Sequence, residues 1–355
     1  MQALEIASLD EFAALRAEWS ALLDRSPTTP PFLAPEWLLP WWTHFGRARL
    51  RAIALRAGGA LAALAPLFEY EQAGRRRLAF VGAGITDYHG LLAGPGGRLE
   101  LAGEFLRQLS LLDDWDECSL DQLARGEALL EVPPPPGLVA ETREQDVCPV
   151  LALPPTFAEL EPGMQAQLRS RLHARYPRRL ATLGRVTYDI ARADTLAEFL
   201  EALFELQRAR WQAGGGVGVL SAEGLEAFHA EVARGMLARG WLRLHGLRID
   251  GRLVAVLYVL ARGPRAYAYL SGFAPGLANY SPGVLLTARA IETAIDEGAR
   301  EFDFLRGAEP HKYRWGARDR INQQLALTRI ASSAAPAAPV PTGIHGRRQR
   351  RSSPS

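Results

Sequence analysis

The sequence predicts a mixed α/β protein built from two similar domains, and three observations support this. Its 355 residues exceed the usual size of one domain. Apolar patterns with the period of strands alternate with patterns of helical period. One segment also recurs, since LRAIALRAGGALAALAPL from Leu50 parallels LRLHGLRIDGRLVAVLYV from Leu242 without gaps. Repetition of so long a unit indicates two similar domains, because a solenoid would need several short repeats.

The first half begins with a helix over 9–23, which Ser8 or Asp10 can cap. A second helix over 35–45 is rich in tryptophan, and its indole rings either line a ligand groove or pack in the core. The Gly58-Gly59 pair favours a hairpin between two alternating segments. The remaining elements are a helix at 99–112 and strands at 50–55, 60–70, 75–81 and 117–120. A glycine-rich loop, 82–97, follows the third of these strands.

The second half repeats this order after the four-proline turn at 133–136, which suggests a boundary. The Asp250-Gly251 pair again favours a hairpin. We therefore expect a first domain over 1–150, a second over 151–330, and a tail over 331–355 that is disordered by composition. The expected strands are 147–153, 186–191, 241–248, 252–261, 266–273, 301–305 and 321–330, with helices at 196–211, 221–239 and from Ser281 to Gly298.

Composition narrows the partners and the compartment. The net charge of +2 gives no general attraction to nucleic acid or to acidic membranes. The two cysteines have no metal-ligand spacing, so we expect no metal site and a reduced, cytoplasmic protein. No signal peptide is evident at the N-terminus. The longest apolar run, 253–261, is too short to span a bilayer.

Two basic stretches have alternative interpretations. Within 168–183, four arginines recur at helical spacing around Pro177, which disfavours a single straight helix. They either face an anion, such as a nucleotide phosphate or RNA, or form a solvated helix face. The cluster RRQRR at 347–351 either contacts nucleic acid or belongs to a solvated tail. The four arginines are Arg171, Arg175, Arg178 and Arg179.

The helix that starts at Ser281 is the most informative stretch. Ser281 is a good N-cap residue, and Pro282 suits the first helical position because its missing N–H costs nothing there. Gly283 leaves the first turn without a side chain. Free N–H groups and the positive end of the helix dipole make such a start a site for phosphate or pyrophosphate, although the same residues also simply begin a helix well. The counterpart helix from Leu99 lacks this start.

The order of elements resembles the GNAT acyltransferase superfamily, and two segments carry the resemblance. They are Tyr280-Ser281-Pro282-Gly283 and FDFLRG…K…W from Phe302 to Trp315. The branch related to the cellulose-biosynthesis acetyltransferase CelD/BcsL and to the FemAB-like peptidyltransferases is the most similar, and FLAPEWLLPWWTHFG near the N-terminus resembles it too. The resemblance covers roughly residues 1–330, and it departs from most members, whose phosphate loop contains more glycine than the single Gly283.

The resemblance implies two tandem GNAT-like domains, each with a mixed, mostly antiparallel sheet flanked by helices. The strands 266–273 and 300–305 would splay apart and hold acyl-CoA as a co-substrate, with no permanently bound cofactor. The pyrophosphate would lie on 279–283. The implied cofactor-binding residues are Tyr269, Leu270, Ser271, Tyr280, Ser281, Pro282 and Gly283; the implied substrate-binding residues are Arg210, Trp211, Asp87 and Trp315.

The implied activity is transfer of an acetyl or longer acyl group to an amine or hydroxyl of a small-molecule or saccharide acceptor, in exopolysaccharide or cell-envelope biosynthesis. Two alternatives stay open. A FemAB-like enzyme would take its acyl group from aminoacyl-tRNA, and a scaffold would keep the fold without activity. The first domain, which lacks the phosphate-site start, is expected to be non-catalytic.

Direct acyl transfer requires loss of a proton from the acceptor and a proton for the leaving thiolate. Neither a G-x-S-x-G elbow nor a Cys–His pair is present, which agrees with direct attack. Asp303, inside an apolar strand, is either the general base or a structural acid. The other candidates, each with a structural alternative, are Lys312 for an anionic group, Tyr313 for protonating the thiolate, His311 as a base or a surface residue, and Asp87 with His89 for acceptor contacts.

Overall fold

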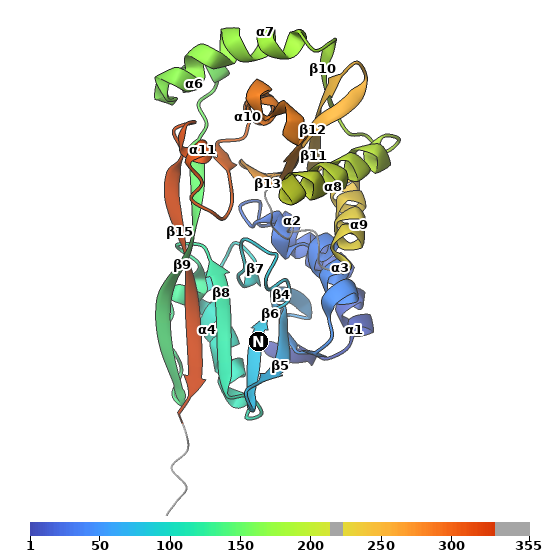
Figure 1. Cartoon of the computed structure of the whole chain (residues 1–355). Helices are drawn as coiled ribbons and strands as arrows, with labels where there is room; N and C mark the ends of the chain where they lie inside the picture. The colour runs from blue at the N-terminus through green and yellow to red at the C-terminus, as the bar shows by residue number, and fades with distance from the viewer. Residues whose placement is uncertain (214–222, 331–355) are drawn as a thin grey trace, which may run out of the picture.

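The computed structural model describes residues 1–213 and 223–330 (Figure 1). In this part of the chain the strands form an 11-stranded sheet and a 4-stranded sheet, with helices packed on them. The expected α/β class with mixed sheets flanked by helices is confirmed. The tail expected over 331–355 lies outside the described residues. None of the described helices is long and apolar enough to cross a membrane.

The first half follows the predicted order of elements. The predicted helix over 9–23 is divided in two at Leu15, and Ser8 caps it through a reciprocal capping box with Glu11. The predicted strand over 60–70 is divided at Pro66. The helices are α1 (Leu9–Ala14), α2 (Arg16–Asp24), α3 (Pro35–Phe45) and α4 (Arg98–Leu111). The strands are β1 (Gln2–Ile6), β2 (Arg49–Leu50), β3 (Ala52–Ala57), β4 (Ala60–Ala65), β5 (Leu67–Gln72), β6 (Arg75–Phe80), β7 (Leu92–Ala93), β8 (Glu117–Leu123) and β9 (Leu138–Ala152).

In the second half, the interruption expected around Pro177 is confirmed, because a π-helical turn over Arg171–Arg175 joins two short helices. Its helices are α5 (Phe157–Leu160), α6 (Ala166–Ser170), α7 (Tyr176–Ala181), α8 (Leu196–Ala213), α9 (Leu225–Ala238), α10 (Pro282–Asp296) and α11 (Pro310–Tyr313). Its strands are β10 (Val186–Ile190), β11 (Leu242–Ile249), β12 (Arg252–Arg262), β13 (Arg265–Phe273), β14 (Glu301–Asp303) and β15 (Arg318–Arg329).

The sequence repeat is also a structural repeat. The hairpins β3–β4 and β11–β12 carry irregularities at matching positions, between Leu55 and Arg56 in the first half and between Leu247 and Arg248 in the second. Both pairs are separated by the same interval as the repeat, since 247 − 55 = 192. Each half then contains a parallel strand pair, β6 beside β8 in the first and β13 beside β14 in the second. The two halves therefore share one architecture.

An arginine at the same place in each hairpin strengthens this equivalence. Arg56 pairs with Glu18 of α2 at 2.8 Å, and Arg248 pairs with Glu198 of α8 in the same manner. Each guanidinium also donates to the carbonyl of the glycine that ends its hairpin turn. The pair ties a helix to the hairpin in both halves, so the repeat extends beyond the strands to the helices that cover them.

The halves exchange their last strands. β9 follows β8 in the chain but pairs with β14 of the second half, whereas β15 follows β14 but pairs with β8 of the first half. β9 and β15 also pair with each other in antiparallel fashion, from Arg318 opposite Val150 to Arg329 opposite Leu138. The large sheet thus runs without interruption through both halves. The boundary expected between residues 150 and 151 falls inside β9.

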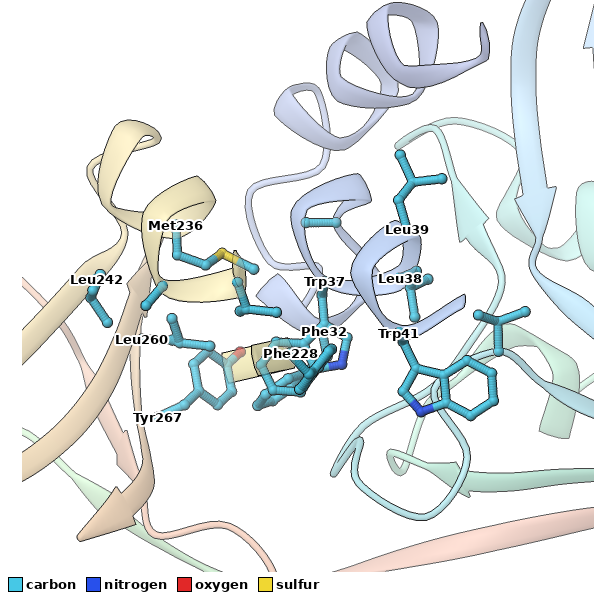
Figure 2. Close-up of a cluster of buried hydrophobic side chains, with 14 of the residues drawn as sticks. Phe32, Trp37, Leu38, Leu39, Trp41, Phe228, Met236, Leu242, Leu260 and Tyr267 are labelled. Atoms are coloured by element: carbon cyan, nitrogen blue, oxygen red, sulfur yellow. The ribbon is translucent and has the colours of Figure 1, made fainter. Parts of the chain in front are cut away.

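An aromatic core also joins the halves (Figure 2). Trp37 of α3 packs edge-on against Phe228 of α9, with ring centroids 5.3 Å apart, and against Tyr269 at 5.0 Å. Phe32 contacts Tyr267 in the same way at 5.7 Å. Aromatic side chains bury large apolar areas, so this contact stabilises the junction strongly. The packing interpretation holds for all three tryptophans of α3, since Trp37, Trp41 and Trp42 are buried.

We predict that the second half does not fold alone. A fragment of residues 153–330 lacks β9, so β14 keeps a single strand partner and β15 loses both. Unpaired buried strands leave backbone groups without partners, and the fragment should show no cooperative thermal transition by circular dichroism. The matched fragment 138–330 restores β9 and should regain part of the transition. Equal cooperative melting of both fragments would contradict the exchange.

Candidate active site

A cleft opens where β13 and β14 separate. The two strands pair in parallel only from Arg265–Tyr267 to Glu301–Asp303. Beyond Tyr267 no strand pairs with β13 on its β14 side among the described residues, and the chain after Asp303 turns away. The strands expected to splay, 266–273 and 300–305, do so. A parallel sheet that opens in its middle is a usual place for a ligand.

Two adjoining cavities occupy this opening. The central cleft, about 260 Å³, lies between the separating strands and is lined by residues of β13 and of the segment after β14, together with Asp87 from the first half. The helix-end cleft, about 230 Å³, lies at the start of α10. The two cavities form one continuous groove, because they share the lining residues Arg210, Leu257, Ser271, Thr287 and His311.

The start of α10 differs from the prediction in one respect. The helix begins with Pro282 at its first position, as expected. Ser281, however, adopts a left-handed conformation with φ of 57°, and its side chain makes no capping hydrogen bond. The predicted serine cap is therefore wrong, because this backbone geometry turns the hydroxyl away from the first-turn amides. Gly283 leaves open space, since an added Cβ would meet only the Phe273 ring, at 3.6 Å.

The residues expected to hold the cofactor mostly line this groove. Ser281, Pro282 and Gly283 line the helix-end cleft, Tyr269 and Leu270 line the central cleft, and Ser271 lines both. The Tyr269 hydroxyl donates to the carbonyl of Ile85 at 2.8 Å, so its ring forms a wall rather than a free donor. Tyr280 is in the lining of neither cleft and instead lies under the guanidinium of Arg179, 5.2 Å from the ring centroid.

An ion pair from the first half reaches the central cleft. Asp87 accepts a hydrogen bond of 2.6 Å from Nε of Arg306, and the Asp87 carbonyl accepts one from Asn322. Burial raises the pKa of the Asp87 carboxyl, and Arg306 offsets part of that rise. The structure thus brings Asp87 to the groove as expected. Arg306 was not among the predicted site residues, although its place directly after the FDFL segment could have signalled it.

His311 stands at the junction of the two clefts. It lines both cavities, and its side chain is solvent-accessible there. Desolvation within the groove lowers the pKa of its imidazole, and Glu309 opposes this shift while nearby cations, including Arg210, reinforce it. The ring is therefore neutral near neutral pH and can accept a proton. Sequence reasoning favoured a surface histidine here, because the spacing along the chain gives no sign that this ring faces a groove.

Comparison with known proteins gives one family match and several structural neighbours. Residues 168–313 match the acetyltransferase (GNAT) domain model. This match lies within the second half of the chain. The crystal structure of FemX superposes with a TM-score of 0.64 at 11% identity, covering 92% of this chain and 97% of FemX. A conserved protein from Bacteroides thetaiotaomicron superposes with a TM-score of 0.58 at 11% identity, covering 93% and 100%. Such likenesses show the fold alone. Curated protein sequences gave no significant match.

Asp303, within the matched residues, is wholly buried and lines neither cleft. Its carboxylate accepts hydrogen bonds from the Tyr88 hydroxyl at 2.7 Å and from the Leu305 amide at 2.8 Å, and Arg320 lies 3.4 Å away. Burial raises the pKa of Asp303 to about 6, and the bond from Tyr88 opposes this rise. Protein donors surround the carboxylate, so an acceptor in the groove does not reach it. Asp303 joins the two halves.

Lys312 is likewise held by the protein. Its ammonium donates to three carbonyls of the turn after β14, those of Leu305, Arg306 and Gly307, at 2.8–3.1 Å, and it pairs with Glu309 at 2.9 Å. Three donors satisfied by backbone carbonyls leave little for an anionic ligand. The lysine fixes the turn in which Leu305 adopts a positive φ of 57°. It therefore shapes the wall of the groove.

The remaining predicted residues divide between the groove and its surroundings. Arg210 lines both cavities, with its guanidinium 5.7 Å from the Phe273 ring centroid. Trp315 is buried and lines the helix-end cleft. Tyr313 lies outside both cavities, and its hydroxyl donates to Asp319 at 2.7 Å. Trp211 belongs to α8, but its side chain lies outside the described residues.

The first half has filled its equivalent opening. β6 and β8 pair in parallel only from Arg77 to Ala79, as their counterparts do. The loop after β6 then enters the gap, where His89 forms an isolated bridge with Leu123. The His89 ring stacks on Phe80, with centroids 5.3 Å apart and planes 8° from parallel. His89 therefore supports the first half and does not line the central cleft.

We predict that Asp303 makes stability fall as pH rises. Its folded pKa lies above its unfolded value, so the folded state binds more protons between the two. The unfolding free energy of the wild type, relative to Asp303→Asn, should fall by about 3 kcal/mol from about pH 4 to about pH 7. Urea denaturation across this range measures the difference, with Asp319→Asn, on the exposed pair with Tyr313, as a control. A pH-independent difference would show that Asp303 ionises as freely as in the unfolded chain.

Proposed function

We propose that the GNAT domain transfers an acyl group from acyl-CoA to an amine or hydroxyl acceptor. One observation carries the proposal: the start of α10 opens through a shared set of side chains into the gap between β13 and β14. A pyrophosphate fits a helix start, because amides and the helix dipole both favour negative charge there. The acyl thioester at the other end of the same donor then lies in the central cleft.

The free edge of β13 suits the arm that links these two ends. Past Tyr267 this edge has no strand beside it on the β14 side in the described chain. The pantetheine arm of CoA contains amide groups, which can pair with backbone groups as an added strand does. The Ser271 carbonyl already accepts a hydrogen bond from Gln207, so it is not available to the pantetheine amides. In this proposal the neighbouring backbone groups of β13 pair with those amides.

The acceptor is placed by groups from both halves. In this proposal the Asp87–Arg306 pair contacts the acceptor and His311 receives its proton as the acceptor nitrogen or oxygen attacks the thioester carbonyl. The bond from carbonyl carbon to sulfur then breaks, and the thiolate takes a proton from the imidazolium or from water. Asp303 and Lys312 act as positioning residues. The resemblance to the cellulose-biosynthesis branch extends the proposal to a saccharide acceptor.

A second candidate donor is aminoacyl-tRNA, and the basic helical stretch favours it. Arg171, Arg175 and Arg178 are exposed, and none has an ion-pair partner within 1–213 and 223–330. Leu168 of the same stretch lines the helix-end cleft, which brings these cations near its mouth. Phosphate contacts would make tRNA binding weaken steeply with salt. Filter binding of charged tRNA at two salt concentrations tests this candidate, and salt-insensitive or absent binding excludes it.

We predict that Gly283→Ala selectively weakens CoA binding. The new Cβ meets only the Phe273 ring at an ordinary contact distance, so the fold should tolerate it and the helix should gain slightly. A bound pyrophosphate needs that space. Isothermal titration with acetyl-CoA should show at least a tenfold loss of affinity.

The matched control for this variant is Gly276→Ala, because no atom lies within 4 Å of a Cβ at Gly276, which is outside both cavities. It should bind acetyl-CoA as the wild type does. If the wild type binds neither acetyl-CoA nor longer acyl-CoAs, the acyl-CoA proposal fails. No transfer from acyl-CoA or aminoacyl-tRNA would then favour the scaffold.

We predict that His311→Gln lowers turnover without loss of donor binding. Removal of a general base lowers kcat by roughly 10²–10⁴. Thiol release from acetyl-CoA, measured over a panel of amines and hydroxyl compounds, gives kcat. Wild-type activity should rise with pH through a pKa below 6.5 and then level off, since the imidazole pKa is lowered from 6.5. An unchanged kcat and pH profile in His311→Gln would assign the proton to another group.

A further inference from the structure

A separate cavity lies between the two halves, and its lining includes Tyr88 and Arg320, which contact Asp303. It measures about 360 Å³ and receives residues from the loop before α3, the start of α4, the segment after β8, and strands β13 and β15. It shares no lining residue with the central or the helix-end cleft. We call it the arginine cavity, because its lining includes Arg98, Arg125, Arg265 and Arg320.

Positive charge exceeds negative charge around this cavity. Arg265 and Arg320 share the carboxylate of Glu301, at 2.8 and 2.9 Å, and Arg320 also approaches Asp303. Arg98 lies 3.5 Å from Glu127. Arg125 has no ion pair within the part of the chain that the structure describes. Four guanidinium groups thus face three carboxylates. Burial also raises the pKa of Glu127 to about 7, which leaves this acid only partly charged near neutral pH.

His89 and the start of α4 also lie at the arginine cavity. His89 lines the cavity, is 4% exposed, and has a buried Nδ1 with no hydrogen-bond partner among the described residues. α4, a helix of 14 residues, begins at Arg98, and Gly97 before it provides no side-chain cap. Buried polar atoms without partners are rare in folded proteins. The helix start and the excess of guanidinium groups favour a negatively charged oxygen ligand. The neutral His89 ring can donate to such an oxygen in the tautomer that carries its hydrogen on Nδ1.

We propose that the arginine cavity is a binding site for a small oxyanion, the phosphate or carboxylate group of a soluble metabolite. The planar guanidinium forks of Arg98 and Arg125 match either group in geometry. Arg265 and Arg320 are already paired, so they form the positive wall of the site rather than its main contacts. The site does not depend on the proposed acyl transfer, since the arginine cavity shares no lining residue with the central cleft or the helix-end cleft.

Titration calorimetry on the full chain tests this site with two probes, inorganic phosphate and citrate. The wild type should bind at least one of them, and the probe that binds more tightly tells phosphate from carboxylate chemistry. The Arg98→Gln/Arg125→Gln variant should lose at least tenfold in affinity. Arg252→Gln removes an exposed arginine at the start of β12, outside all three cavities, and should bind as the wild type does. Gly283→Ala should also retain binding, because it alters only the helix-end cleft.

Three results would overturn the proposal. They are the absence of binding of both probes, an equal loss in Arg252→Gln, and a loss confined to Gly283→Ala, which would place the anion at α10. If the double variant does not fold, Arg125→Gln alone is measured, because Arg125 is exposed and makes no ion pair in the described chain. A tenfold loss there supports the site, and unchanged binding contradicts it. Titration of the same variants with acetyl-CoA distinguishes failure of the proposed donor site from failure of the arginine cavity.

Discussion

The antiparallel pairing of β9 with β15 supports the rest of this molecule. β14 has only three residues, and its parallel contact with β13 covers the same three. So short a strand holds its place only if its other edge is paired as well, and β9 supplies that edge from the first half of the chain. With β14 fixed from that side, β13 can diverge from it without unravelling the sheet. The gap between β13 and β14 is therefore maintained by a strand that lies outside residues 168–313.

The turn after β14 converts this support into a site. Asp303 holds the amide of Leu305, and Lys312 holds the carbonyls that follow. Both charged groups are buried, and each is stabilised by hydrogen bonds that only this backbone conformation provides. The turn in consequence directs Arg306 and His311 toward the groove. Removing Asp303 or Lys312 would leave the backbone groups bonded to it without their partner. These two residues therefore support the wall of the groove.

The sequence could predict the elements and the repeat, because periodicity and turn residues are local properties. These properties located the hairpin at Asp250-Gly251 and the helix start at Pro282, whereas the divergence near Asp303 was implied by the family resemblance. The sequence could not predict the exchange of β9 and β15, since an apolar strand pattern does not determine which strand pairs with it. The groups that surround Asp303 and the exposure of His311 in the groove likewise depend on contacts with distant residues. The Ser281 cap failed because a serine is also compatible with a left-handed backbone.

One loop of the first half contributes contacts to both halves. Asp87, Tyr88 and His89 are consecutive, yet they act in three places: on Arg306 in the central cleft, on buried Asp303, and on Phe80 inside the first half. This loop fills the opening of the first half and also forms part of the wall of the central cleft. A change that freed it would open the first half and remove two contacts from the second together. The same loop therefore underlies both the inactivity proposed for the first half and the site proposed for the second.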